Sequence, residues 1–152
     1  MKAHLKLIIA LIAFAICNKA IAADIECYDA KIRAKPIAQI PTVLGDSGED
    51  IIIYWPWFLD LKIKRVIEGE VPEREITILA LMHSYFREKT LTMLLRRNTA
   101  GTFNLIRAEP SSIRRCEAGS EPVPPYLRPG DGKTLDDYRR EGEEELNGIN
   151  KK

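Results

Sequence analysis

The chain has 152 residues, of which 45% are hydrophobic and 30% are charged, and its 23 Lys and Arg and 22 Asp and Glu residues give a formal net charge of +1. This length is enough for one domain with a hydrophobic core. A net charge so close to zero argues against binding to nucleic acid or to an anionic membrane through bulk charge.

Residues 1–22 have the pattern of a secretory signal peptide. Lys2 and Lys6 form a short positive start, an apolar run of eleven residues follows over 7–17, and Ala20-Ile21-Ala22 has the small-x-small pattern of a cleavage site. We therefore expect cleavage after Ala22 and a periplasmic or secreted mature protein.

Two other interpretations of this segment have less support. A transmembrane anchor is not expected, because the apolar run of eleven residues is well short of the roughly 20 residues that cross a bilayer as a helix. A lipoprotein anchor at Cys17 is the second alternative. It requires a small residue before the cysteine, where this chain has the bulky Ile16.

Removal of residues 1–22 changes the charge and the cysteine content of the chain. Three lysines and no acids are lost, so that 130 residues remain and the formal charge falls from +1 to −2. The negative mature chain gives further reason to expect no nucleic-acid partner. Cys17 is lost as well, which leaves Cys27 and Cys116.

These two remaining cysteines predict one disulfide bond. In an oxidising compartment an even pair of cysteines usually forms a bridge. Closing a loop of about 90 residues stabilises a fold by about 4 to 5 kcal/mol in the chain-entropy model. Two free buried thiols are the alternative. A metal site is disfavoured, because the chain has no C-x-x-C spacing and the mature part keeps one histidine.

The first predicted strand covers residues 31–40. Its apolar positions alternate with lysine, arginine and glutamine, which is the period-two pattern of a half-buried strand. Pro36 lies inside the pattern and has no N–H to donate, so we expect an edge strand or a bulge at this point. Residues 41–50 contain Gly45 and Gly48 and predict a loop.

Residues 51–67 form the longest strand-like run. Apolar side chains at alternate positions share one face, and they are Ile53, Trp55, Trp57, Leu59, Leu61 and Ile63. The two tryptophans of this face are expected in the core, because each must hide a large apolar area. The alternation changes phase at Val66, which predicts a β-bulge near Lys64 and Arg65.

Tyr54 and Phe58 lie on the opposite, more polar face of the same run. Exposed aromatic side chains bind glycans, peptides and nucleic-acid bases. We therefore expect these two residues to be exposed and name them as candidate contacts for a partner. The loop at 41–50 and the C-terminal tail are further candidates.

The next segments complete an all-β pattern. Residues 68–72 predict a turn, and 74–82 is apolar on both faces, as in a central strand that is covered on both sides. Segments 90–97 and 102–107 predict a hairpin around the four residues 98–101. About five short strands with little helix are typical of a small barrel or sandwich.

The composition changes after Cys116. Residues 117–152 contain nine acids, six bases, four prolines and five glycines, and few large apolar side chains. We expect a charged, solvated and partly disordered tail over 119–152, next to a β domain over 23–118. A short helix is predicted within it, because Thr134 and Asp137 have capping-box spacing and a thin apolar stripe follows at Leu135, Tyr138 and Leu146.

The order of these features resembles the netrin-module OB barrels typified by the tissue inhibitors of metalloproteases. The resemblance covers about residues 26–118. It rests on a cysteine before the first strand, the segment Lys64-Arg65-Val66-Ile67-Glu68-Gly69, the strand Glu75-Ile76-Thr77-Ile78, the aromatic Phe86, a leucine-rich strand and the closing Arg115-Cys116. It implies a five-stranded OB-like barrel, a fold that hosts many unrelated functions.

One departure from this family bears on function. In the inhibitors the mature chain begins with a cysteine whose free amino group reaches the catalytic zinc of the protease. Here the expected mature start is Ala23, and Cys27 lies four residues inside it. Metalloprotease inhibition by that mechanism is therefore not expected.

No motif predicts catalysis, a cofactor or a metal. His83 and Ser84 are neighbours on a predicted strand and should point to opposite faces, which makes them a poor base and nucleophile. The segment 130–134 ends like a phosphate-binding loop but has Leu127 where the first glycine is required. The acids between 46 and 50 lack the spacing of a calcium loop.

Our leading hypothesis is a periplasmic or secreted, non-enzymatic protein that binds another envelope or extracellular protein. The first alternative is a hydrolytic enzyme that uses carboxylates alone, although no acid lies in an apolar context that predicts a raised pKa. The second is a protease inhibitor that acts without N-terminal cysteine chelation. Oligonucleotide binding by an OB face is disfavoured by export and by the charge of the mature chain.

Overall fold

The computed structural model describes residues 27–43, 53–107, 112–130 and 132–149. The expected signal peptide and most of the predicted loop at 41–50 lie outside these ranges. Within them, no helix combines the length and apolar character that a bilayer crossing requires.

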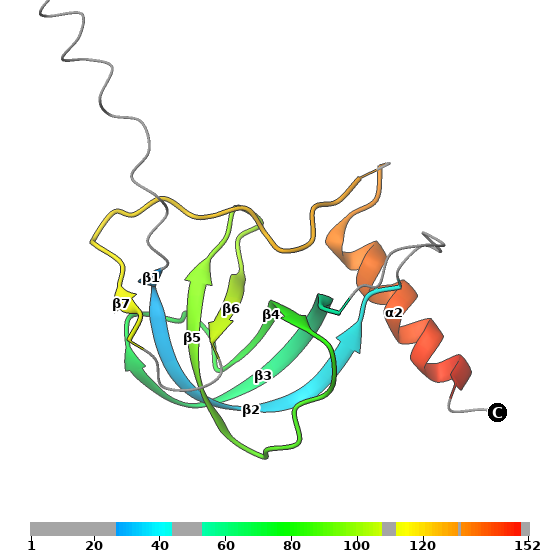
Figure 1. Cartoon of the computed structure of the whole chain (residues 1–152), viewed down its shortest axis with the longest axis horizontal. Helices are drawn as coiled ribbons and strands as arrows, with labels where there is room; N and C mark the ends of the chain where they lie inside the picture. Colours follow the sequence, from blue (N-terminus) through cyan, green and yellow to red (C-terminus); the bar gives the residue numbers. More distant parts are fainter. Residues whose placement is uncertain (1–26, 44–52, 108–111, 131, 150–152) are drawn as a thin grey trace, which may run out of the picture.

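The centre of the structure is a closed barrel of five strands (Figure 1). The strands are β2 (Ala30–Pro41), β3 (Trp55–Glu68), β4 (Glu75–Met82), β5 (Leu91–Arg97) and β6 (Phe103–Arg107). They are ordered β2-β3-β4-β6-β5, with β4 and β6 parallel and every other neighbouring pair antiparallel. The predicted all-β, OB-like barrel is confirmed, and so is the hairpin of β5 and β6.

The barrel interior follows from the alternation in the sequence. Successive residues of a strand point to opposite faces, so one parity of each strand fills the barrel. Trp57 is 2% exposed, and Trp55 is half-buried against the same core. The fully enclosed side chains include Ile32, Leu59, Leu61, Ile78, Met93 and Leu95.

Both predicted irregularities are present in the pairing of β2 with β3. Ala34 lies opposite Ile63 and Arg33 lies opposite Arg65, so Lys64 is an extra residue on β3. A second shift falls between Pro36 and Ala38 on β2. The proline is thus accommodated at a bulge, where its missing N–H does not interrupt a regular ladder.

A second, two-stranded sheet closes one end of the barrel. β1 (Cys27–Tyr28) runs parallel to β7 (Arg114–Arg115). The predicted disulfide is present between Cys27 and Cys116, whose α-carbons are 4.9 Å apart. The bridge therefore joins the start of the barrel to its end.

The C-terminal tail contains the helix that its sequence predicts, and most of its described residues are exposed or half-buried. Helix α2 (Leu135–Ile149) packs beside β2, and the chain that leads to it crosses the strands β5 and β6 (Figure 1). The predicted cap is present, since Thr134 Oγ1 accepts a hydrogen bond from the backbone N–H of Asp137 at 3.2 Å. The thin apolar stripe packs against the barrel, and Gly142 is the residue of the described helix that is buried there.

This packing also explains why one predicted contact residue is misplaced. Phe58 is 3% exposed, so the expectation that it faces solvent is wrong. It joins Ile40 and Leu79 in a cluster on the outer face of the barrel. The residues that cover this cluster come largely from the tail, and they are Tyr126, Leu127, Leu135, Tyr138 and Leu146.

Candidate functional site

The strongest candidate for a functional surface lies where β3 begins and β4 ends. Tyr54, Leu81 and Tyr85 line a depression of about 430 Å³ there, together with His83. We call these four residues the aromatic surface. It combines the segment before β3 with the segment after β4, because the two strands are antiparallel and Trp55 lies opposite Met82.

Buried tryptophan anchors the aromatic surface. The indole N–H of Trp57 donates a hydrogen bond to the carbonyl of Met82 at 3.1 Å. Its ring meets the edge of Tyr85 at 4.8 Å between centroids, in a T-shaped arrangement that is favourable for aromatic pairs. Tyr54 makes a similar edge contact with His83 at 5.5 Å. Both tyrosines are therefore held by a neighbouring ring.

The aromatic surface remains open to solvent in spite of its apolar character. Tyr54 is 60% exposed, Tyr85 49% and Leu81 45%, and the adjacent Ile53 is 63% exposed. The exposure expected for Tyr54 is confirmed. Single exposed apolar residues are ordinary, but a contiguous group of them is typical of a surface that meets another molecule.

The sequence did not indicate Tyr85 or Leu81 as part of this surface. Leu81 belongs to a strand that is apolar on both faces, and such a pattern does not distinguish a covered face from an open one. Tyr85 lies after the strand, in a segment without periodicity. One feature of the sequence could have indicated Tyr85. It lies beside Phe86 in a connection whose other residues are mostly charged or polar.

His83 and Ser84 are closer together than expected. They lie in a bend that follows β4 rather than in the strand, and Ser84 Oγ is 3.3 Å from His83 Nε2. The expectation that they point to opposite faces is therefore wrong. Nucleophilic catalysis also requires a group that orients the base. The ring contact with Tyr54 is the other interaction of His83 in the described part of the chain.

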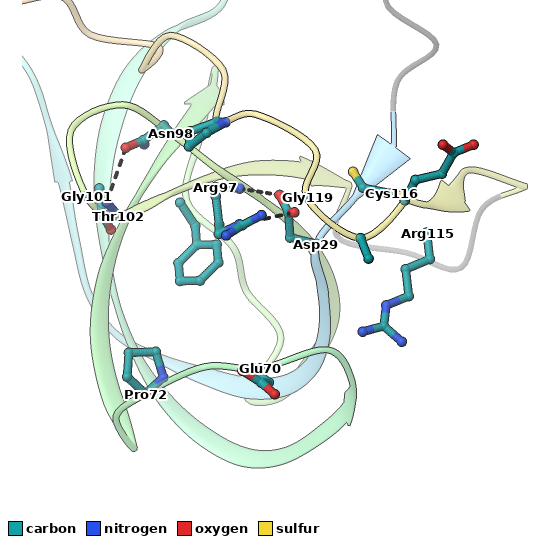
Figure 2. Close-up of a pocket in the computed structure, with 14 residues that line it drawn as sticks. Asp29, Glu70, Pro72, Arg97, Asn98, Gly101, Thr102, Arg115, Cys116 and Gly119 are labelled. Atoms are coloured by element: carbon teal, nitrogen blue, oxygen red, sulfur yellow. Dashed lines mark hydrogen bonds and ion pairs between the residues drawn. The ribbon is translucent and has the colours of Figure 1, made fainter.

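A second hollow of about 730 Å³ lies at the end of the barrel that carries the disulfide (Figure 2). Asp29 is its central charged group. The Asp29 carboxylate accepts hydrogen bonds from Arg96 at 2.9 Å and from the backbone N–H of Arg97 at 2.7 Å. Figure 2 shows the Arg97 side chain directed at the same carboxylate. The hollow therefore contains an acid that is already neutralised.

Arg96 connects this network to the disulfide. Its guanidinium also lies 2.9 Å from Cys116 Sγ and donates to the carbonyl of Glu121 at 2.6 Å. Only 11% of the Arg96 side chain is exposed. Because every one of these contacts stays within the protein, the Arg96 guanidinium joins the strand end to the disulfide and to the tail.

The carboxyl groups whose pKa is shifted do not support the alternative of a hydrolytic enzyme. A hydrogen bond from Arg139 lowers the pKa of Asp60, and a hydrogen bond from Tyr28 lowers the pKa of Glu68. A general acid at neutral pH requires a raised pKa. The part of the chain that the structure describes has no group of three or more potential ligands that would hold a metal ion.

The face of the barrel that binds oligonucleotides in other OB folds is occupied here. That face centres on the second and third strands of the barrel, which are β3 and β4 in this chain. Phe58 and Leu79 mark its middle and lie under the tail. This arrangement is a structural reason against oligonucleotide binding that is independent of net charge.

No protein-family model, curated protein or solved structure matches this chain. The resemblance to netrin-module barrels thus stays a prediction, and function must be argued from the surfaces described above.

Proposed function

We propose that the protein is a secreted or periplasmic, non-enzymatic module that binds a partner protein of the cell envelope through the aromatic surface. The observation that carries this proposal is the open group of Tyr54, Leu81 and Tyr85, fixed from below by the buried Trp57. Tyrosine is enriched at protein interfaces, because it offers a large contact area and a polar group at low cost in side-chain entropy.

The surroundings of the aromatic surface support a protein as the partner. Arg87 and Glu88 border the same depression, together with His83 and Ser84. An apolar centre with a charged and polar border is the usual arrangement of a protein interface. Because the rings of Tyr54 and Tyr85 are already held by His83 and Trp57, little conformational freedom remains to be lost on binding.

The Cys27–Cys116 disulfide supports the proposed location. Disulfides persist in the periplasm and in the extracellular medium and are rare in the reducing cytosol. Residues 1–22 supply the matching signal-peptide pattern. Together these features favour a protein that works outside the cytoplasm.

Site-specific photocrosslinking in cells tests the proposal. A photoreactive phenylalanine analogue replaces Tyr54 in one strain and Ile149 in a second strain. Ile149 is a matched control because it is 62% exposed but lies at the end of α2. We expect a discrete crosslinked protein from position 54 that is absent from position 149. A crosslink of equal yield from both positions, or none from position 54, overturns the proposal.

The captured partner then allows a quantitative test. Tyr54→Ala and Tyr85→Ala remove exposed side chains, so the variants should fold as the parent does. Aromatic hot spots of an interface contribute about 2 kcal/mol or more each, so the double variant should bind on the order of 1000-fold more weakly. Unchanged affinity would show that the partner binds elsewhere.

A further inference from the structure

The second surface of interest is a group of cations at the other end of β3. Arg33 and Lys35 on β2 and Lys62, Lys64 and Arg65 on β3 are all exposed. The strands are neighbours in the barrel (Figure 1). We call these five residues the cationic surface.

The pairing register places like charges directly opposite one another. Arg33 lies opposite Arg65, and Lys35 lies opposite Lys62. Directly opposite residues of an antiparallel pair have Cβ atoms about 5 Å apart, and like charges in such pairs are destabilising. The fold therefore holds cations close together at a cost to its own stability.

Acidic residues compensate only the margins of the cationic surface. Glu75 binds Lys62 at 3.0 Å, and Glu68 lies 3.7 Å from the neighbouring Lys31. In the described ranges, Arg33, Lys35, Lys64 and Arg65 form no ion pair. Four positive charges on two adjacent strands are therefore available to an anionic partner.

The geometry of the cationic surface suits an array of phosphates. Side chains of one face repeat about every 7 Å along a strand, and neighbouring strands are about 4.8 Å apart. Closure of the barrel keeps both strands in fixed register. An extended surface that carries many phosphate groups is complementary to such a rigid grid of cations.

An exposed apolar residue next to the cations favours a membrane over other polyanions. Ile67 lies two positions after Arg65 and is 40% exposed, whereas Val66 lies opposite Ile32, which is buried in the barrel core. Cations combined with exposed apolar side chains are typical of proteins that lie on an anionic bilayer. Single-stranded nucleic acid, in contrast, is bound on aromatic platforms, and none of the five residues of this surface is aromatic.

We propose that the cationic surface docks the protein onto an anionic phospholipid membrane. Arg33, Lys35, Lys64 and Arg65 bind the headgroup phosphates, and Ile67 enters the boundary between headgroups and acyl chains. The expected mature chain has a net charge of −2, so attachment depends on this local group and not on bulk charge. The aromatic surface, at the opposite end of β3, stays free for its partner.

Vesicle sedimentation with a matched charge control tests this proposal. The protein is the oxidised chain from Ala23, which keeps every residue of the described fold and lacks the apolar segment 7–17. The test variant carries Arg33→Gln, Lys35→Gln and Arg65→Gln. The control variant carries Arg114→Gln, Arg128→Gln and Arg140→Gln, which lie on β7, in the tail and on α2. Both variants lose three positive charges, so their net charges are equal.

Vesicles of phosphatidylglycerol and phosphatidylcholine should bind the parent protein, and phosphatidylcholine vesicles should not. Each cation near an anionic bilayer contributes roughly five-fold in binding, so the test variant should bind on the order of 100-fold more weakly. The control variant should bind within a few-fold of the parent. An increase in salt from about 0.1 M to about 1 M should release the parent, because the Debye length falls from about 10 Å to about 3 Å.

Three results would overturn the proposal. The first is no binding of the parent to phosphatidylglycerol vesicles. The second is an equal loss in the test and control variants, which would indicate bulk charge alone. The third is displacement from vesicles by a single-stranded oligonucleotide at equal phosphate concentration, which would indicate a nucleic-acid site. Circular dichroism of both variants ensures that a loss of binding is not a loss of fold.

Discussion

Asp60 on β3 and Arg139 on α2 are 79 residues apart in the chain and form a bidentate ion pair, with both guanidinium–carboxylate distances at 2.7 Å. Thr77 on β4 donates a further hydrogen bond to Asp60 at 2.7 Å. The pair is half-buried, with about a quarter of each side chain exposed. It joins α2 to the barrel beside the apolar contacts of the helix.

Arg139→Gln should destabilise the protein by about 1 to 2 kcal/mol at neutral pH, because a partly buried charged hydrogen-bond pair is lost. The effect should depend on pH. The pKa of Asp60 is lowered from its ordinary value in the folded state, mainly by its hydrogen bonds from Arg139. The stabilisation is therefore complete above about pH 5 and declines as the pH falls below about 4.

Urea unfolding of the parent and the variant at several pH values measures this difference. Arg140→Gln is the control, because Arg140 is the next residue of the helix and is largely exposed beside Asp137. It should change stability by less than about 0.5 kcal/mol. A difference between parent and Arg139→Gln that is constant down to about pH 2 would show that Asp60 is not the group responsible.

Two glycines of α2 offer an internal comparison. A methyl group at Gly142 would overlap the carbonyl oxygen of Pro41, whereas a methyl group at Gly148 would meet no atom within 4 Å. Gly142→Ala should therefore push the helix away from the barrel and cost about 1 to 3 kcal/mol. Gly148→Ala should stabilise the helix by up to about 1 kcal/mol. Equal effects on the midpoint of thermal unfolding would contradict the described packing of α2.

Asn104 attaches the tail to the barrel through its amide group. It is 1% exposed, accepts from Asn98 at 2.9 Å and donates to the carbonyl of Pro124 at 2.9 Å. Asn104→Ala leaves the amide of the buried Asn98 without this acceptor and releases the carbonyl of Pro124, which should cost about 1 to 3 kcal/mol. Limited trypsin digestion should then cut faster at Lys133, in the chain that leads to α2. Asn147→Ala, an exposed site on α2, should leave both the stability and the digestion rate unchanged.

The disulfide should be a major contributor to stability. Its cysteines are 89 residues apart, and closing such a loop contributes about 4 to 5 kcal/mol in the chain-entropy model. The double variant Cys27→Ser and Cys116→Ser should unfold at a much lower urea concentration than the oxidised parent. Addition of a reductant should shift the parent and leave the double variant unchanged. A parent that is insensitive to full reduction would contradict this expectation.

The barrel was predictable because its strands carry their own signals. Alternation in 31–40 and 51–67 indicated which face is buried, and the phase change at Val66 indicated the bulge at Lys64. The strands β1 and β7 were not predictable, because a segment of two residues is too short to show an alternation of apolar and polar side chains. Their pairing depends on the disulfide and on the closed barrel.

Surfaces were harder to predict than strands. Parity placed Tyr54 and Phe58 on the same outer face, but it contains no information about what covers that face. The tail covers Phe58 and leaves Tyr54 open. The cationic surface has the same origin, because Arg33 and Arg65 meet only through the register of two strands that are distant in sequence. The local composition of a strand does not predict which residues of a distant strand will lie opposite it.

The bridge between Cys27 and Cys116 makes the barrel a covalent ring. A single backbone cut anywhere between these residues leaves both pieces attached to each other. The connection between β4 and β5, residues 83–90, is mostly exposed and is thus a place where a protease can cut without releasing a fragment. Cleavage there is expected to leave a two-chain protein whose strands stay paired. Such tolerance suits the location outside the cytoplasm that we propose.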